Sequence, residues 1–252
     1  MKNDYPATEH IPQLRALWTA SFGDGDQFLD NFHATAFSPA RCRCALVDGD
    51  VAAALYWFDV SCGDAPMAYV YAVATAPAYR EQGFCHALME DTHLLLKKLG
   101  YHGILLVPDG DALTKMYAGF GYTPCTSVKE FVCAPTGDPA TMHRVDTAEY
   151  ARIRRRLLPV GSVIQEGENL TFLAPLARFY AAEGVVAAVS RETEHLRIPE
   201  YLGDPALAPG LVAALGAQEA TLRYPGNEKP FSMYLPLSAD CVKPAYFVFC
   251  FD

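Results

Sequence analysis

A strand-like run followed by a glycine-containing turn offers the clearest chemistry in this chain. Residues 68–75 read Ala-Tyr-Val-Tyr-Ala-Val-Ala-Thr, and residues 77–88 continue through Arg80 and Gly83 into the start of an amphipathic helix. The first turn of a helix has backbone N–H groups without partners inside the helix, and the helix dipole adds positive potential there. Such a turn favours anions, typically phosphate, and Arg80 adds a fixed positive charge. The motif therefore predicts a site for a cofactor that carries a pyrophosphate.

Composition narrows the class of protein. The 252 residues can form one large domain or two smaller ones, and 51% hydrophobic with 19% charged residues indicates a folded chain. A net charge of -9 argues against broad nucleic-acid binding. Residues 1–10 lack a secretory pattern and no apolar run is long enough to span a membrane, so we expect a cytoplasmic protein. The eight cysteines form no CxxC pair, and no metal site is predicted.

The elements that must position the turn follow from hydrophobic spacing. Because one strand–helix–strand crossover links residues 67–75 to 102–108, these strands should pair in parallel within a mixed sheet. Asp48-Gly49-Asp50 predicts a hairpin between two further strands. The expected elements are helices at 10–21, after Gly25, at 84–99 and through Tyr117, and strands at 41–48, 51–60, 67–75, 102–108 and 122–132.

The second half repeats this order in part. A turn-rich linker at 134–139 suggests two domains, residues 1–134 and 140–252. The expected elements there are helices at 146–158, 169–181 and 206–215, and strands at 185–191, 194–201, 219–224, 231–236 and 245–251. Where the first half has its Arg-and-Gly turn, the second has Asp204, which repels phosphate, and Pro205, which lacks an N–H. A duplication would thus leave one working anion site.

These residues resemble the GNAT family of acyl-CoA N-acyltransferases. The family's cofactor motif matches Arg80, Gly83 and Cys85, although cysteine stands in place of a small glycine or alanine. A second match is the helix that ends at Tyr117, followed by a glycine-aromatic pair at 119–122. The likeness covers residues of about 5 to 133. It implies an α/β (α+β) GNAT fold, a mixed and mostly antiparallel sheet flanked by helices, and a duplicated, degenerate second half as in Eis-type tandem acetyltransferases.

The resemblance also implies a binding mode for acetyl-CoA as co-substrate. The pantetheine arm would pair with backbone groups of the third strand, and the N–H of Val73 would support the developing oxyanion. The pyrophosphate would bind amides of residues 82–86 beside Arg80. The cofactor-binding residues expected in this way are Ala72, Val73, Ala74, Arg80, Glu81, Gln82, Gly83, Phe84, Cys85 and His86.

Tyr117 is the expected catalytic residue, as general acid for the leaving thiolate. A phenol and a thiol have pKa values close enough for proton transfer, but Tyr117 could instead only pack under the cofactor. The sequence does not identify a residue that would act as the general base. Tyr69 and Tyr71 occupy the outward positions of the strand and could relay a proton through water; Asp252, with its terminal carboxylate, is another candidate beside an ordinary strand end.

The leading hypothesis is an acetyl-CoA-dependent N-acetyltransferase that acts on a primary amine of a small molecule or peptide. One alternative is a non-catalytic acyl-CoA-binding or regulatory protein that keeps the cofactor turn. Another is an aminoacyl or acyl transferase with a different donor. We expect neither a nucleic-acid partner nor a membrane partner. The sequence is compatible with a homo-oligomer.

Overall fold

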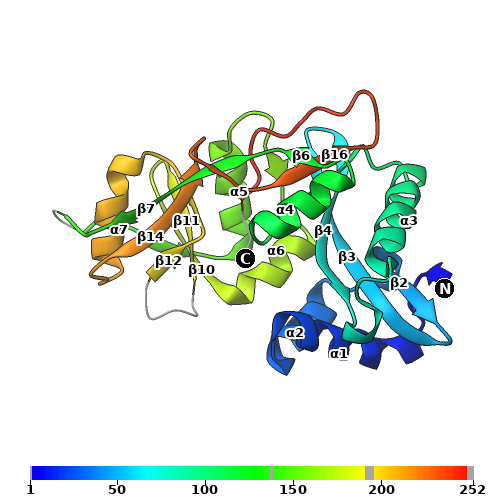
Figure 1. Ribbon diagram of the computed structural model, residues 1–252. Helices are drawn as coiled ribbons and strands as arrows, with labels where there is room; N and C mark the ends of the chain where they lie inside the picture. The colour runs from blue at the N-terminus through cyan, green and yellow to red at the C-terminus, as the bar shows by residue number, and fades with distance from the viewer. Residues whose placement is uncertain (1, 137–138, 191–195, 249–252) are drawn as a thin grey trace.

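The chain forms two lobes that share strands. The computed structural model describes residues 2–136, 139–190 and 196–248. Figure 1 shows the long strands β3 (Asp50–Cys62) and β4 (Ala65–Thr75) in one lobe and α7 (Ala208–Ala214) at the other end of the molecule, with α6 (Glu168–Leu173) between them. The expected mixed α/β architecture is confirmed.

The first lobe follows the expected order of elements. Its helices are α1 (Ile11–Phe22), α2 (Asp26–Thr35), α3 (Phe84–Lys98) and α4 (Gly110–Gly119), and its other early strands are β1 (Lys2–Asp4), β2 (Cys42–Val47), β5 (Gly103–Leu106) and β6 (Thr123–Pro124). Asp48 and Gly49 both have positive φ, 53° and 94°, in the turn that joins β2 to β3. Such conformations suit the tight hairpin turn that the Asp-Gly pair predicts.

One sheet positions the candidate site. Its strand order is β1-β2-β3-β4-β5-β16-β6, where β16 is Met233–Pro236. The predicted parallel pairing of β4 with β5 is confirmed, and it covers only Met67 to Tyr69 of β4. Beyond Tyr69 the two strands pair no further in this register, so the rest of β4 has an edge that β5 does not cover. This divergence of β4 and β5 opens the sheet at its middle.

Three strands cross between the lobes, one of which, β9 (Val163–Ile164) of the second half, pairs with the end of β3. The single strand expected at 122–132 was wrong: it splits into β6 in the first sheet and β7 (Ser127–Cys133), which pairs with β14 (Ala220–Pro225) of the second half. In return β16 leaves the second half and pairs with β5 and β6. Figure 1 shows β7 running from the first lobe into the second. The division at residues 134–140 stays a proposal, and sheet membership crosses it in both directions.

The second half contains two four-stranded sheets. Their orders are β13-β11-β10-β8 and β12-β14-β7-β15. The elements not yet given are α5 (Thr147–Leu157), β8 (His143–Val145), β10 (Ala177–Ala182), β11 (Val185–Ser190), β12 (Leu196–Ile198), β13 (Glu200–Leu202) and β15 (Lys229–Pro230).

The helix expected over 169–181 was wrong in its second part. Helix α6 ends at Leu173, and Pro175 follows inside a short 3-10 turn. In β10, Ala177, Phe179 and Ala181 are buried while the residues between them are more exposed. This period of two belongs to a strand with one covered face. The strand expected at 245–251 is absent from its described residues, 245–248, apart from a bridge between Ser162 and Tyr246.

The core divides along the two faces of the first sheet. Met67 and Tyr69 of β4 belong to one buried cluster, together with Trp18, and Ala68 and Val70 belong to another that contains Tyr117. Alternate side chains of a strand point to opposite faces, which explains the division. We call these the α1 face and the α3 face, because the first cluster contains residues of α1 and the second contains residues of α3.

A buried ionic network anchors the last described residues. Arg154 donates from Nε to Oε2 of Glu200 at 2.7 Å, and the Tyr246 hydroxyl donates to Oε1 of Glu200 at 3.2 Å. Phe247 follows, and its ring lies 4.8 Å from that of Tyr69 on the α1 face. The second half therefore supplies part of the packing around the middle of β4.

Candidate active site

The predicted phosphate turn lies between β4 and α3 with a backbone suited to anion binding. Glu81 has φ 60° and Gly83, the N-cap of α3, has φ 83°. No side chain caps the helix start. A Cβ added at Gly83 would meet nothing within 4 Å, so the space beside the turn is open. An uncapped first turn with open space beside it fits the expected pyrophosphate site.

The side chains of the turn brace it from both ends. Arg80 is exposed and donates from Nε to the carbonyl of Thr75 at 3.1 Å. Gln82 donates to the carbonyl of Ala78 at 2.8 Å. These bonds tie the turn to the end of β4 and to the preceding 3-10 turn. They use only the Nε of Arg80, so its two terminal nitrogens are free of these bonds.

The start of α3 separates inward from outward side chains. Phe84 and Cys85 are half-buried and pack against the α3-face cluster, while Glu81 is exposed. Burial raises the pKa of the Cys85 thiol. His86 is exposed. Its Nε2 lies 3.2 Å from Oε1 of Glu90, and its ring centroid lies 4.8 Å from that of Phe120. Cys85, which stands where the family motif has glycine or alanine, therefore places its thiol on the half-buried side of the turn.

A β-bulge marks the middle of β4. Tyr71 lies opposite Tyr56 and Ala74 opposite Ala54, so two residues, Ala72 and Val73, face the single Leu55. Ala72 has φ 49°, in the left-handed region that non-glycine residues rarely adopt. A bulge redirects backbone groups at its position. It falls where β5 has already left β4, so the expected cofactor-arm residues Ala72 and Val73 lie on an open stretch of strand.

A cavity of about 1440 Å³ occupies the divergence of β4 and β5. Its lining includes five of the residues that the sequence predicts for the site, namely Tyr69, Tyr71, Ala72, Val73 and Tyr117. Ligand pockets are commonly about 300–1,000 Å³, so this volume suits a long cofactor arm and a second substrate together. Ala74 and residues 80–86 are not part of this lining and lie at the adjoining strand end and helix start.

Tyr117 lies on the α3 face of this cavity. Its residue is 6% exposed, and its ring centroid is 5.8 Å from that of Tyr122. Burial raises the pKa of the Tyr117 phenol, with a smaller effect from Cys85, so the group is protonated at neutral pH. Among the described residues its hydroxyl has no hydrogen-bond partner, which leaves it available to a ligand.

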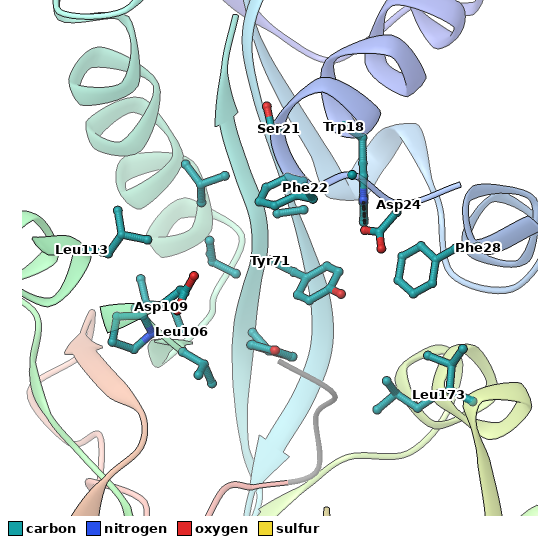
Figure 2. Close-up of a pocket in the computed structure, with 18 of the residues that line it drawn as sticks. Trp18, Ser21, Phe22, Asp24, Phe28, Tyr71, Leu106, Asp109, Leu113 and Leu173 are labelled. Carbon is teal, nitrogen blue, oxygen red and sulfur yellow. Dashed lines mark hydrogen bonds between the residues drawn. The ribbon is translucent and has the colours of Figure 1, made fainter. Parts of the chain in front are cut away.

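On the α1 face of the cavity the sequence predicted only Tyr69 and Tyr71 as site residues, and the rest of this wall was not predicted. Figure 2 shows Tyr71 directed from β4 toward the side where Trp18, Asp24 and Phe28 lie, with Leu106 and Asp109 on the other side of the strand. The Trp18 ring centroid is 5.7 Å from that of Tyr71. Asp24 accepts a 2.8 Å hydrogen bond from the indole of Trp18. An aromatic wall with one carboxylate is suited to an amine.

Sequence reasoning missed this wall because its residues belong to separate elements. Asp24 lies in the Gly-Asp-Gly break after α1, which reads only as a helix end. Leu173 ends α6 in the second half and lines the same cavity. Of the expected substrate residues, Tyr71 is half-buried, Tyr69 is 2% exposed, and Asp252 lies outside the described residues.

The residues that the structure describes contain neither a metal-binding cluster nor a membrane-spanning helix. Within these ranges no group of three or more His, Cys, Asp or Glu side chains is arranged to hold a metal ion. No described helix is both long enough and apolar enough to cross a membrane.

The chain resembles a known family in sequence and solved proteins in structure. Residues 4–125 match the family model described as an acetyltransferase (GNAT) domain. A GCN5-related N-acetyltransferase from Kribbella flavida is similar in structure, with a TM-score of 0.72 and 17% identity over 92% of this chain and 70% of its own. Eis1 from Mycobacterium abscessus has a TM-score of 0.72 and 14% identity over 95% and 75%.

A third similar structure is a tandem GNAT protein from the clavulanic acid biosynthesis pathway. It has a TM-score of 0.60 and 13% identity, over 95% of this chain and 99% of its own. No curated protein matches the chain in sequence. Residues 4–125 therefore belong to the GNAT acetyltransferase family, within a two-lobed fold shared with a tandem GNAT protein.

Proposed function

We propose that this protein is an acetyl-CoA-dependent N-acetyltransferase that acts on a primary amine. The observation that carries the proposal is one continuous cavity in the divergence of β4 and β5, lined by Val73 and Tyr117 and also by Trp18, Asp24 and Tyr71. The first two belong to the α3-face cluster and Trp18 and Tyr71 to the α1-face cluster. A cofactor arm and an acceptor would thus reach the bulge from opposite faces of the sheet.

The donor side of the reaction rests on the turn and the bulge. Acetyl-CoA supplies an activated acetyl thioester. Arg80 and the amides of residues 82–86 would hold its pyrophosphate, because both present positive potential beside open space. The bulge at Ala72 and Val73 would present a backbone N–H to the acetyl carbonyl oxygen, which gains negative charge as the amine adds.

Tyr117 would protonate the leaving sulfur. The amine nitrogen forms a bond to the acetyl carbon, the carbon–sulfur bond breaks, and the sulfur takes the phenol proton. The nitrogen loses one proton to water as the amide forms, and water reprotonates Tyr117. Burial raises the pKa of Tyr117. The same dry surroundings would raise the pKa of the leaving CoA thiol, because they disfavour thiolate and phenolate alike, so the proton transfer would remain favourable.

Asp24 would receive the acceptor. A neutral amine is the nucleophile, and an amine arrives protonated at neutral pH. The Asp24 carboxylate would attract this cation and take its excess proton through water, with Tyr71 beside it on the α1 face. The Trp18 indole holds the carboxylate at the cavity wall.

The test measures binding and turnover separately. Isothermal titration calorimetry gives the affinity for acetyl-CoA, and release of the CoA thiol in the presence of a panel of primary amines gives turnover. We expect micromolar binding and amine-dependent thiol release. Tight binding without release for any amine would favour a non-catalytic acyl-CoA-binding protein instead.

A further inference from the structure

The second half places a cationic side chain in the wall of the acceptor cavity. Arg223 of β14 lines the cavity together with Lys229, Pro230 and Phe231. Leu222, its neighbour on the strand, belongs to the hydrophobic core of the second half. Because adjacent strand residues point to opposite faces, Arg223 is directed away from that core. Phe231 packs against the α1-face cluster, so this wall lies on the acceptor side of the sheet.

The Arg223 side chain is held in place by its neighbours, but not all of its hydrogen-bond donors have partners among the described residues. Its residue is 6% exposed, its Nε donates to Oε1 of Glu130 at 2.9 Å, and its guanidinium lies 4.7 Å from the centre of the Phe231 ring. Its Nη1 is buried and has no hydrogen-bond partner among the residues that the structure describes. A buried donor left without a partner is costly, and a charged one more so. The guanidinium therefore has unused donor capacity at the cavity wall.

Among the described residues, the ion pairs around Arg223 leave one positive charge. Glu130 also accepts from Lys229 Nζ at 2.7 Å, so two cations share one carboxylate. Partial burial acts to raise the pKa of Glu130, but the bonds to Lys229 and Arg223 bring that pKa below its usual value. Glu130 is therefore ionised at neutral pH. The one positive charge left over matches the single negative charge of a carboxylate, whereas a phosphate monoester carries about 1.5 to 2 negative charges.

We infer that Arg223 binds a carboxylate of the acceptor, and that the substrate class is therefore amino acids or amines that carry a carboxyl group. This inference rests on the proposed N-acetyltransferase function. Asp24 would receive the amine of such an acceptor and Arg223 its carboxylate, because both line the cavity and their aromatic partners Trp18 and Phe231 pack in the α1-face cluster. A planar guanidinium fixed on an aromatic ring is suited to a planar carboxylate.

The experiment compares matched acceptors. Thiol release is measured with L-phenylalanine and with 2-phenylethylamine, which lacks the carboxyl group, for the wild-type protein, Arg223→Gln and Arg223→Lys. Arg155→Gln is the matched control, since Arg155 is exposed on α5 and pairs with Glu166 away from the cavity lining. Comparing the kcat/KM ratio of the two acceptors between variants cancels their different intrinsic reactivity.

We expect Arg223→Gln to lower kcat/KM for L-phenylalanine by about 10- to 100-fold and to change that for 2-phenylethylamine by less than about 2-fold. Arg223→Lys should recover part of the loss, and Arg155→Gln should change neither value. An equal loss for both acceptors would assign Arg223 a structural role and overturn the inference. So would an Arg223→Gln loss that is larger for phosphoethanolamine than for β-alanine.

A binding measurement separates this inference from the proposed function. Calorimetry with N-acetyl-L-phenylalanine and its uncharged amide needs no turnover. Stronger binding of the acid that is lost in Arg223→Gln would support the carboxylate site even if no amine released thiol, in which case the proposed function alone would fail. Equal binding of acid and amide, or no binding of either, would overturn the inference while any amine-dependent thiol release kept the proposed function intact. Circular dichroism melting confirms that each variant is folded.

Discussion

The indole N–H of Trp18 donates a 2.8 Å hydrogen bond to Oδ2 of Asp24 at the wall of the central cavity. Trp18 is 3% exposed and packs against Tyr56 and Tyr71 of the sheet, with ring centroids 5.1 and 5.7 Å away. The bond therefore ties a carboxylate in a loop to a side chain that the core holds still. A loop residue gains a defined position in this way.

Asp24→Asn should lower kcat/KM for amine acceptors by about 10-fold or more, because it removes the negative charge that attracts the amine but keeps the side-chain shape. The affinity for acetyl-CoA should stay within about 2-fold. Steady-state thiol release and calorimetry measure the two quantities. Trp18→Phe, which keeps a ring but loses the N–H, should give a smaller loss in the same direction. Full activity in Asp24→Asn would exclude this residue from the acceptor site.

Tyr117→Phe should lower kcat by about 100-fold, since general acid catalysis contributes about that much or more. The acetyl-CoA affinity should change little, because the ring still packs in the α3-face cluster. Tyr122→Phe is the matched control: its hydroxyl bonds to His93 at 3.0 Å, so its loss affects stability and not turnover. Single-turnover thiol release distinguishes the two variants. Unchanged turnover in Tyr117→Phe would leave that residue a packing role only.

Gly83→Ala should weaken acetyl-CoA binding about 5-fold. A Cβ there meets no atom within 4 Å, but φ 83° costs an alanine about 1 kcal/mol, which shifts the turn away from its present geometry. Gly100→Ala is an equivalent change at φ 89°, also in open space, beyond the other end of α3. Both variants should lose similar unfolding free energy in urea. Equal loss of acetyl-CoA affinity in both would contradict a specific role for the turn at Gly83.

His93 should make the protein less stable as the pH falls from about 6.5 to about 4. Burial lowers the pKa of His93 to about 4, whereas the unfolded chain takes up that proton near pH 6.5. Between these values the unfolded state binds more protons, so acidification favours unfolding, and the effect levels off below pH 4.

The measurement is the free energy of unfolding in urea at several pH values. His93→Gln should flatten the difference across this window, since glutamine does not titrate. The exposed His143→Gln should leave the profile as in the wild type. If His93→Gln and wild type kept parallel profiles, His93 would have no part in the acid sensitivity.

Local pattern predicted the elements around the donor site well. The open turn at Gly83, the amphipathic helix α3 and the helix that carries Tyr117 are each encoded by neighbouring residues, through positive φ at glycine and apolar spacing of three and four. The parallel pairing of β4 with β5 also followed, because a helix between two strands leaves few alternatives.

The same reasoning failed where Pro175 separates α6 from β10. The residues from Ala177 to Ala182 contain three alanines, which favour a helix by propensity, and the sheet partner β11 overrides that preference. Propensity is weak compared with the burial of Phe179 and its neighbours on one sheet face.

The sequence by itself therefore determined the turn at Gly83, the helix that carries Tyr117, the hairpin of β2 with β3 and the parallel pairing of β4 with β5. Only the tertiary structure decided that β16 enters this sheet beside β5, that β7 leaves it, and that Asp24 and Arg223 share one cavity. The physical reason is sequence separation. Backbone hydrogen bonds are the same for any pair of strands, so the choice of partner between β5 and β16 depends on packing of side chains more than 120 residues apart, which no local pattern records.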